Sequence, residues 1–135
     1  MDFPPACPEI PVADLAAGLA YYRDRLGFTV DWADEGLGVA GLSRGAARVF
    51  MTDAGFRAGR GNQAPVVLWL NPSSRAEIDE LHREWAAAGA LIDARPEAKP
   101  WRLYEFFARD PDGNVLRVFY DFGWEEDGAA DQPSL

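Results

Sequence analysis

The sequence predicts an α+β fold in which one order of elements, strand–helix–three strands, occurs twice. Three observations predict it: two amphipathic helical segments, a group of short strand-like segments after each of them, and a glycine-rich polar loop between the halves. The 135 residues are 48% hydrophobic and 26% charged, which fits one globular domain over residues 1–135. Because neither half has enough apolar surface to fold alone, we expect two sheets that complete one curved surface, with the helices outside.

The first half spans residues 8–53 and contains a helix predicted over residues 15–26. Asp14 is suited to cap this helix and Gly27 to end it. The apolar residues of the helix recur at spacings of four, three and four: Leu15, Leu19, Tyr22 and Leu26. Alternating segments between turn-prone residues then predict three strands, over residues 28–33, 37–43 and 46–52.

A connecting loop over residues 54–64 leads to the second half, residues 65–122. Its helix is predicted over residues 75–88, where Ser74 and Glu77 have the spacing of a capping box. The buried stripe of this helix is Ile78, Leu81 and Trp85, and Gly89 ends it. Its strands are expected over residues 66–70, 91–94, 103–109 and 114–122. The last residues, 123–135, form an acidic tail that is expected to fray.

Thirteen basic residues against 22 acidic residues give the chain a net charge of −9. This charge repels nucleic acid and anionic membranes and attracts cationic ligands, although acidity also simply keeps a protein soluble. The single cysteine, Cys7, excludes an intramolecular disulfide and a multi-thiolate zinc site. Without a long apolar run or a secretory signal, we expect a cytoplasmic protein that binds neither nucleic acid nor a membrane.

The best-specified local feature is a tight hairpin at residues 110–113, Asp-Pro-Asp-Gly. Proline presets the first central position of the turn, and glycine accepts the positive φ that a three-residue loop with a bulge requires. If Asp110 faces Asn114, the register of the two strands places four side chains on one face, namely Glu105, Phe107, Arg117 and Phe119. In this register Phe107 lies opposite Arg117 and Glu105 opposite Phe119, while Leu116 and Val118 pack on the helices.

A carboxylate and a guanidinium beside two phenyl rings leave two interpretations open. The face binds a ligand, or Glu105 and Arg117 form a salt bridge with no ligand. Tryptophans add a second indication. Trp85 is assigned to the core, Trp32 and Trp69 lie in strands where alternation decides which side they face, and Trp101 lies in a loop. Large flat side chains around a cavity suit a planar, partly apolar ligand.

Three segments together resemble the vicinal oxygen chelate superfamily, which includes glyoxalase I, extradiol dioxygenases and bleomycin-resistance proteins. They are Pro-Glu-Ile-Pro-Val-Ala-Asp-Leu at residues 8–15, Tyr-Tyr-Arg-Asp-Arg-Leu-Gly-Phe at 21–28 and Asp-Pro-Asp-Gly-Asn at 110–114. The resemblance covers about residues 8–120. It implies the glyoxalase/bleomycin-resistance fold, in which paired βαβββ modules form a cup-shaped mixed sheet, usually in a homodimer.

Metal-dependent members of that superfamily place His or Glu at four inward strand positions. The corresponding positions here hold Cys7, Phe50, Pro65 or Val67, and Arg117. A phenyl group, an apolar residue, a guanidinium and one thiol do not hold a hard divalent ion. We therefore expect no metal, no cofactor and no metal-dependent lyase, epimerase or dioxygenase activity. The single histidine, His82, is expected on the solvent side of the second helix.

The residues from Leu26-Gly27-Phe28 through Arg44-Gly45 to Phe50-Met51 are most similar to the bleomycin-resistance branch. That resemblance implies a metal-free binding protein that sequesters a cationic, partly aromatic antibiotic such as bleomycin, without catalytic residues. The candidate ligand-binding residues are Trp32, Phe50, Trp69, Trp101, Glu105, Phe107, Arg117 and Phe119. Arg102 departs from the pattern, since many relatives have glycine there.

Two other functions stay open. The first is a metal-independent lyase or isomerase, in which Arg117 holds a substrate carboxylate or enolate and Glu105 exchanges a proton. The second is a structural or regulatory dimer that binds no small molecule. A phosphate-binding loop at residues 57–61 is discounted, because its glycines precede no helix.

Overall fold

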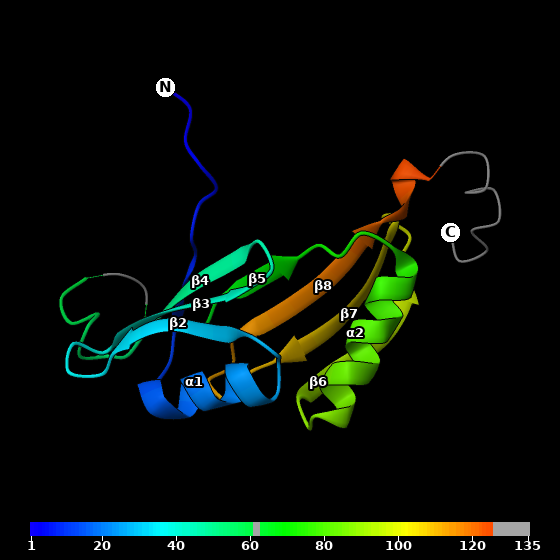
Figure 1. Cartoon of the computed structure of the whole chain (residues 1–135). Helices are drawn as coiled ribbons and strands as arrows, with labels where there is room; N and C mark the ends of the chain where they lie inside the picture. The colour runs from blue at the N-terminus through cyan, green and yellow to red at the C-terminus, as the bar shows by residue number, and fades with distance from the viewer. Residues whose placement is uncertain (61–62, 126–135) are drawn as a thin grey trace. The chain divides into compact units, whose positions relative to one another are not determined.

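The computed structural model describes residues 1–60 and 63–125 (Figure 1). By its contacts the chain forms two compact units, and each contains one four-stranded mixed sheet and one α-helix. The first unit comprises Met1–Val66 together with Asp110–Asn114, and the second comprises Val67–Arg109 and the chain from Val115 onward. The predicted α+β fold with two strand–helix–three-strand modules is confirmed. Within the described residues, neither helix is long and apolar enough to cross a membrane.

The sheet of the first unit has the strand order β1-β4-β3-β2. Its strands are β1 (Glu9–Pro11), β2 (Thr29–Asp34), β3 (Val39–Arg44) and β4 (Ala47–Thr52). Only β1 runs parallel to its neighbour, because α1 (Leu15–Asp24) separates it from the antiparallel strands. The Asp14 carboxylate accepts a hydrogen bond from the Ala17 amide at 2.8 Å, which confirms the predicted cap.

All four residues of the predicted apolar stripe of the first helix are buried, although α1 itself ends two residues earlier than expected. They face buried side chains of β3 and β4, which are Ala40, Leu42, Val49 and Met51. Each buried aliphatic or aromatic side chain of this size contributes about 1.5–3 kcal/mol to folding. This core occupies one face of the sheet, so the opposite face is available for a site.

The second unit repeats this arrangement with the strand order β5-β8-β7-β6. Its elements are β5 (Val67–Leu70), α2 (Arg75–Ala87), β6 (Leu91–Ala98), β7 (Leu103–Arg109) and β8 (Val115–Asp121). The predicted cap is confirmed in part: the Glu77 amide donates to Ser74 Oγ at 3.1 Å, but the Glu77 carboxylate accepts from the Ser73 amide, at 2.7 Å, instead of the Ser74 amide. Trp85 is fully buried, as predicted.

Two details of the second unit differ from the expectation. The strand expected over residues 91–94 continues to Ala98. The acidic tail was expected to begin at residue 123, but Phe122–Trp124 form a short 3₁₀ helix, anchored by the buried Phe122 ring. The remaining part of that tail, residues 126–135, lies outside the described residues.

A β-bulge occurs at the same place in both sheets. The register of β2 shifts between Val30 and Trp32, and that of β6 shifts between Ile92 and Ala94. The bulged residue is an aspartate in each strand, and it accepts a hydrogen bond from the neighbouring strand: Asp31 from Ser43 Oγ at 3.1 Å, and Asp93 from Arg109 Nε at 2.9 Å. Each bulge turns the following residue onto the sheet face opposite the helix.

Tyr104 provides a pH-dependent contact between α2 and β7. Its hydroxyl donates to Asp79 Oδ1 at 2.6 Å, and burial together with this bond raises the pKa of Tyr104 to about 12. The fold favours the neutral phenol, so this stabilisation is complete below about pH 10 and is lost as the pH rises towards 12. We expect the Tyr104→Phe variant to lose about 1–2 kcal/mol of unfolding free energy at pH 8.

The absorbance of tyrosinate at 295 nm measures this shift directly. The tyrosine titration of the Tyr104→Phe variant should lack one group that ionises near pH 12. A titration in which the missing group ionises near pH 10, the value of a free phenol, would contradict the assignment.

Candidate functional site

In the second unit, four residues lie directly opposite one another across the whole sheet, on the face away from α2. The row runs through β5, β8, β7 and β6 and consists of Trp69, Arg117, Phe107 and Ala94. On the other face of β7 and β8, Phe106, Ala108, Leu116 and Val118 are fully buried, and Phe106 packs against Trp85 of α2. The predicted pairs Phe107–Arg117 and Glu105–Phe119 are both observed.

Arg117 and Glu105 form an ion pair with two hydrogen bonds. Arg117 Nε lies 3.1 Å from Glu105 Oε2, and the terminal nitrogen Nη2 lies 2.7 Å from Oε1. The Glu105 side chain is fully buried, whereas that of Arg117 is 21% exposed. The guanidinium carbon also lies 4.2 Å from the ring centre of Trp69 and 4.7 Å from that of Phe107. The pair thus forms a neutral, flat centre among aromatic rings.

The aromatic rings around this pair remain accessible. Trp69 is 49% exposed and Trp101 is 56% exposed, while Phe107 and Phe119 are half-buried. Trp69 meets Phe119 edge to face at 5.4 Å, and Trp101 lies 5.9 Å from the Arg117 guanidinium. Six of the predicted ligand-binding residues therefore lie in one cluster. Within this cluster, the buried Glu105 carboxylate fixes the Arg117 guanidinium through two hydrogen bonds, and the rings of Trp69 and Trp101 are exposed to solvent.

Trp101 is held by a hairpin loop of the same form as the Asp-Pro-Asp-Gly loop. The Lys99 amide donates to the Leu103 carbonyl at 2.9 Å, and the Arg102 amide donates to the Lys99 carbonyl at 2.9 Å. Arg102 adopts a φ of 70°, while Gly113 at the corresponding place of the other loop adopts 88°. An arginine in this conformation costs about 1–2 kcal/mol. A glycine at this position would avoid that cost.

The equivalent row of the first unit has different chemistry. It runs through β2, β3, β4 and β1 and consists of Trp32, Gly41, Phe50 and Glu9. The Trp32 indole lies directly on Gly41, where a Cβ atom would stand 2.4 Å from Nε1. A hollow of about 280 Å³ opens on this row, lined by Glu9, Trp32, Val39, Phe50, Thr52 and Phe56.

Four of these lining residues were missed from the sequence, namely Glu9, Val39, Thr52 and Phe56. A signal for Glu9 was present, because residues two apart in a strand share a face and Cys7 was already assigned an inward position. Phe56 carried no such signal, since it lies in the irregular loop after β4. Of the predicted ligand-binding residues, Trp32 and Phe50 line this hollow.

The residues on these two faces do not fit a divalent metal ion. In the second unit a guanidinium occupies the centre of the row and engages both oxygens of Glu105. In the first unit, Glu9 is the single carboxylate among the residues that line the hollow. Among the described residues, no three His, Cys, Asp or Glu side chains are placed so that they could hold one metal ion together. His82 is half-buried and its ring meets that of Phe106 at 5.3 Å, so it is less exposed than a fully solvent-side histidine.

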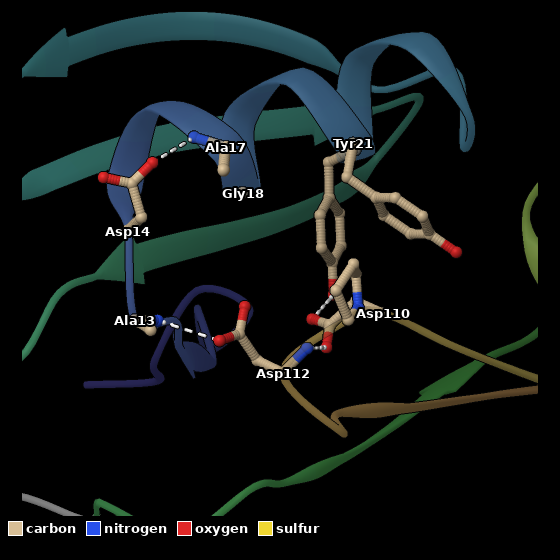
Figure 2. A pocket seen from close by; sticks show the side chains of 9 residues that line it. Ala13, Asp14, Ala17, Gly18, Tyr21, Asp110 and Asp112 are labelled. Carbon is tan, nitrogen blue, oxygen red and sulfur yellow. Dashed lines mark hydrogen bonds between the residues drawn. The ribbon is translucent and has the colours of Figure 1, made fainter.

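A second hollow, of about 220 Å³, lies between α1 and the tip of the Asp-Pro-Asp-Gly hairpin, and Figure 2 shows hydrogen bonds made by its aspartates. Asp112 accepts from the Ala13 amide at 2.9 Å, and Asp110 accepts from the Tyr22 hydroxyl at 2.8 Å. Burial, and then the Asp110 carboxylate, raises the pKa of Tyr22 well above its usual value. These contacts join the hairpin tip to α1, which is a structural role.

The fold agrees with the comparisons to known proteins. The chain belongs to the Glyoxalase/Bleomycin resistance protein/Dioxygenase superfamily, whose family model matches residues 6–118. It is 30% identical over 125 residues to a bleomycin resistance protein of Geobacillus stearothermophilus, covering 83% of this chain and 92% of that protein.

Two solved structures illustrate the range of the superfamily. A bleomycin-binding protein from Streptomyces verticillus, complexed with copper(II)-bleomycin, is 26% identical with a TM-score of 0.67, over 87% of this chain and 96% of that one. A lactoylglutathione lyase from Agrobacterium tumefaciens is 21% identical with a TM-score of 0.72, over 91% and 98%. The second likeness shows the fold alone.

Proposed function

We propose that this protein binds and sequesters a cationic, partly aromatic antibiotic of the bleomycin type, without a metal ion of its own and without changing its ligand chemically. The observation that carries the proposal is the pair of cross-strand rows with exposed tryptophans. Rings of this kind bind planar ligands by stacking, and an acidic chain attracts a cation. The similarity to bleomycin resistance proteins supports the choice of ligand.

The alternative, a metal-independent enzyme, gains no support from the geometry of its proposed base. Both oxygens of Glu105 accept hydrogen bonds from Arg117, and the carboxylate is fully buried. A general base must come within hydrogen-bond distance of the proton that it removes. Glu105 would have to break its ion pair to do so.

Titration of tryptophan fluorescence with bleomycin tests the proposal. We expect saturable quenching at one drug per protomer, and we expect the protein to protect DNA from bleomycin cleavage. Trp69→Ala should weaken binding by about tenfold, because an exposed ring that stacks on a planar ligand contributes about 1–2 kcal/mol. Treatment with a chelator should leave the affinity for metal-free bleomycin unchanged.

Trp124→Ala is the matched control, because Trp124 is 82% exposed and lies in the 3₁₀ helix outside both rows. Its affinity should equal that of the wild type. If bleomycin causes no saturable quenching and DNA is cleaved at the usual rate, the drug assignment is wrong. An affinity for metal-free bleomycin that falls after treatment with a chelator would contradict the proposal that the protein binds its ligand without a metal ion of its own.

We further propose that the protein is a homodimer, as the family resemblance implies, and that it is cytoplasmic. Light scattering on the eluting protein should then give twice the chain mass of 14.9 kDa. A mass equal to one chain at micromolar concentration would contradict the dimer.

A further inference from the structure

We propose that the hollow of the first unit is a subsite for an organic cation, a protonated amine carried on an apolar or aromatic group, and that the Glu9 carboxylate selects for its charge. This inference rests on the proposed function, because it assumes that the aromatic face of the first unit binds ligand. It adds the chemical group that this face recognises and the residue responsible.

The shape of the hollow follows from the cross-strand row. The absence of a side chain at Gly41 lets the Trp32 indole lie flat on β3, with its ring centre 5.9 Å from that of Phe50 at an angle of 58°. Phe56, 43% exposed, adds a third ring. Aromatic rings on several sides attract a cation through their negative faces, and the apolar walls accommodate the group that carries it.

Glu9 supplies the negative charge at the end of this row. Its Oε2 atom accepts a hydrogen bond from the Thr52 hydroxyl at 2.9 Å, which fixes the orientation of the carboxylate. Among the described residues Glu9 has no direct ion pair, so its other oxygen can face a ligand. An ammonium group there combines a charged hydrogen bond with the cation–π contacts.

Arg57 fixes the position of Thr52, the residue that orients the Glu9 carboxylate. It is 6% exposed and donates to Thr52 Oγ1 at 3.0 Å and to the Thr52 carbonyl. Thr52 therefore lies between the guanidinium and Glu9, accepting from one and donating to the other. Because Arg57 also belongs to the loop that carries Phe56, the same contacts keep that ring at the hollow. Arg57 is thus a positioning residue for the subsite.

The second unit offers no equivalent subsite. On its row Arg117 stands where Phe50 stands on the first, and Trp69 stands where Glu9 stands, as the parallel pairs Trp69–Arg117 and Glu9–Phe50 show. The Arg117 guanidinium engages both oxygens of Glu105, so this row leaves no carboxylate oxygen for an ammonium group. Recognition of a cation is therefore assigned to the first unit alone.

The test compares two probes of equal size, 2-phenylethylammonium and the neutral 2-phenylethanol, by NMR titration of the full chain at pH 7. The Trp32 indole N–H signal, identified by its loss in Trp32→Phe, reports binding at the hollow. We expect the ammonium to bind more tightly than the alcohol. Glu9→Gln should lower the affinity for the ammonium about tenfold. The affinity for the alcohol should stay within twofold of the wild type, since the glutamine side chain still accepts a hydrogen bond from Thr52.

Two further variants isolate charge from shape. Glu80→Gln on the exposed side of α2 removes the same unit of charge elsewhere, and it should bind both probes as the wild type does. Gly41→Ala, checked for folding by circular dichroism, should weaken both probes because its methyl group displaces Trp32. The proposal is overturned if Glu9→Gln and Glu80→Gln behave alike, if the alcohol binds as tightly as the ammonium, or if Gly41→Ala leaves both affinities unchanged.

The outcomes separate this inference from the proposed function. If ammonium binding depends on Glu9 but bleomycin does not bind, the subsite proposal stands and the assignment of bleomycin as the ligand is wrong. If the wild type and Glu9→Gln bind bleomycin equally well, the subsite proposal is wrong and the assignment of bleomycin as the ligand stands.

Discussion

Replacement of Asp110 by alanine is expected to lower the free energy of unfolding by about 3–5 kcal/mol. The carboxylate is 1% exposed and accepts four hydrogen bonds. Its Oδ1 atom accepts from the amides of Asp112 and Asn114, and its Oδ2 atom accepts from the Tyr22 hydroxyl and the Asn114 side chain, at 2.8–3.0 Å. Alanine removes the acceptor of all four hydrogen bonds at once.

The network extends beyond the turn, which is why the effect should be large. The Asn114 side chain also donates to the Pro11 carbonyl at 2.8 Å and accepts from the Val66 amide at 2.9 Å. Loss of Asp110 therefore loosens three segments that are distant in sequence. Urea unfolding followed by circular dichroism measures the change.

Asp112→Ala is the matched control for this prediction. Asp112 lies two residues further along the same turn, is half-buried, and accepts one hydrogen bond, from the Ala13 amide. Asp112→Ala should lower the free energy of unfolding by about 1 kcal/mol. If the two variants differ by less than 1 kcal/mol, the Asp110 network does not hold the turn in the way described. Tyr22→Phe, which removes one of the four donors, should lie between them.

Much of the second unit was predictable because its signals are local. The Asp-Pro-Asp-Gly loop sets a register, and with a period of two that register determines which side chains share a face. The pairs Glu105–Phe119 and Phe107–Arg117 followed directly. The helix stripes and caps were equally local. The residues that determine each of these elements lie within the element or a few positions from its ends in the sequence.

The first unit was less predictable because its site depends on a bulge. Without the extra residue at Asp31, Trp32 would pair with Ala40 and face the helix; with it, Trp32 pairs with Gly41 and faces the hollow. Alternation alone could not decide between these sides. Phe56 and Arg57 come from a loop whose path follows from tertiary contacts with Thr52 rather than from any periodic pattern.

Arg117→Met is expected to destabilise the second unit by about 3–5 kcal/mol, because it leaves the buried Glu105 carboxylate without a partner. Glu105→Leu should cost less, about 2–3 kcal/mol, since the guanidinium that remains is 21% exposed and can be hydrated. The double variant should recover most of the loss, because an apolar pair of similar volume replaces the ion pair. Urea unfolding of all four proteins gives the coupling free energy.

Strictly additive losses in this cycle would contradict the ion pair as the link between β7 and β8. The double variant also decides between the two interpretations that the sequence left open. We expect it to fold and yet to bind bleomycin more weakly, because the guanidinium packs 4.2 Å from the Trp69 ring and orients the surface on which a planar ligand stacks. Unchanged binding in a stable double variant would mean that Glu105 and Arg117 serve the fold alone.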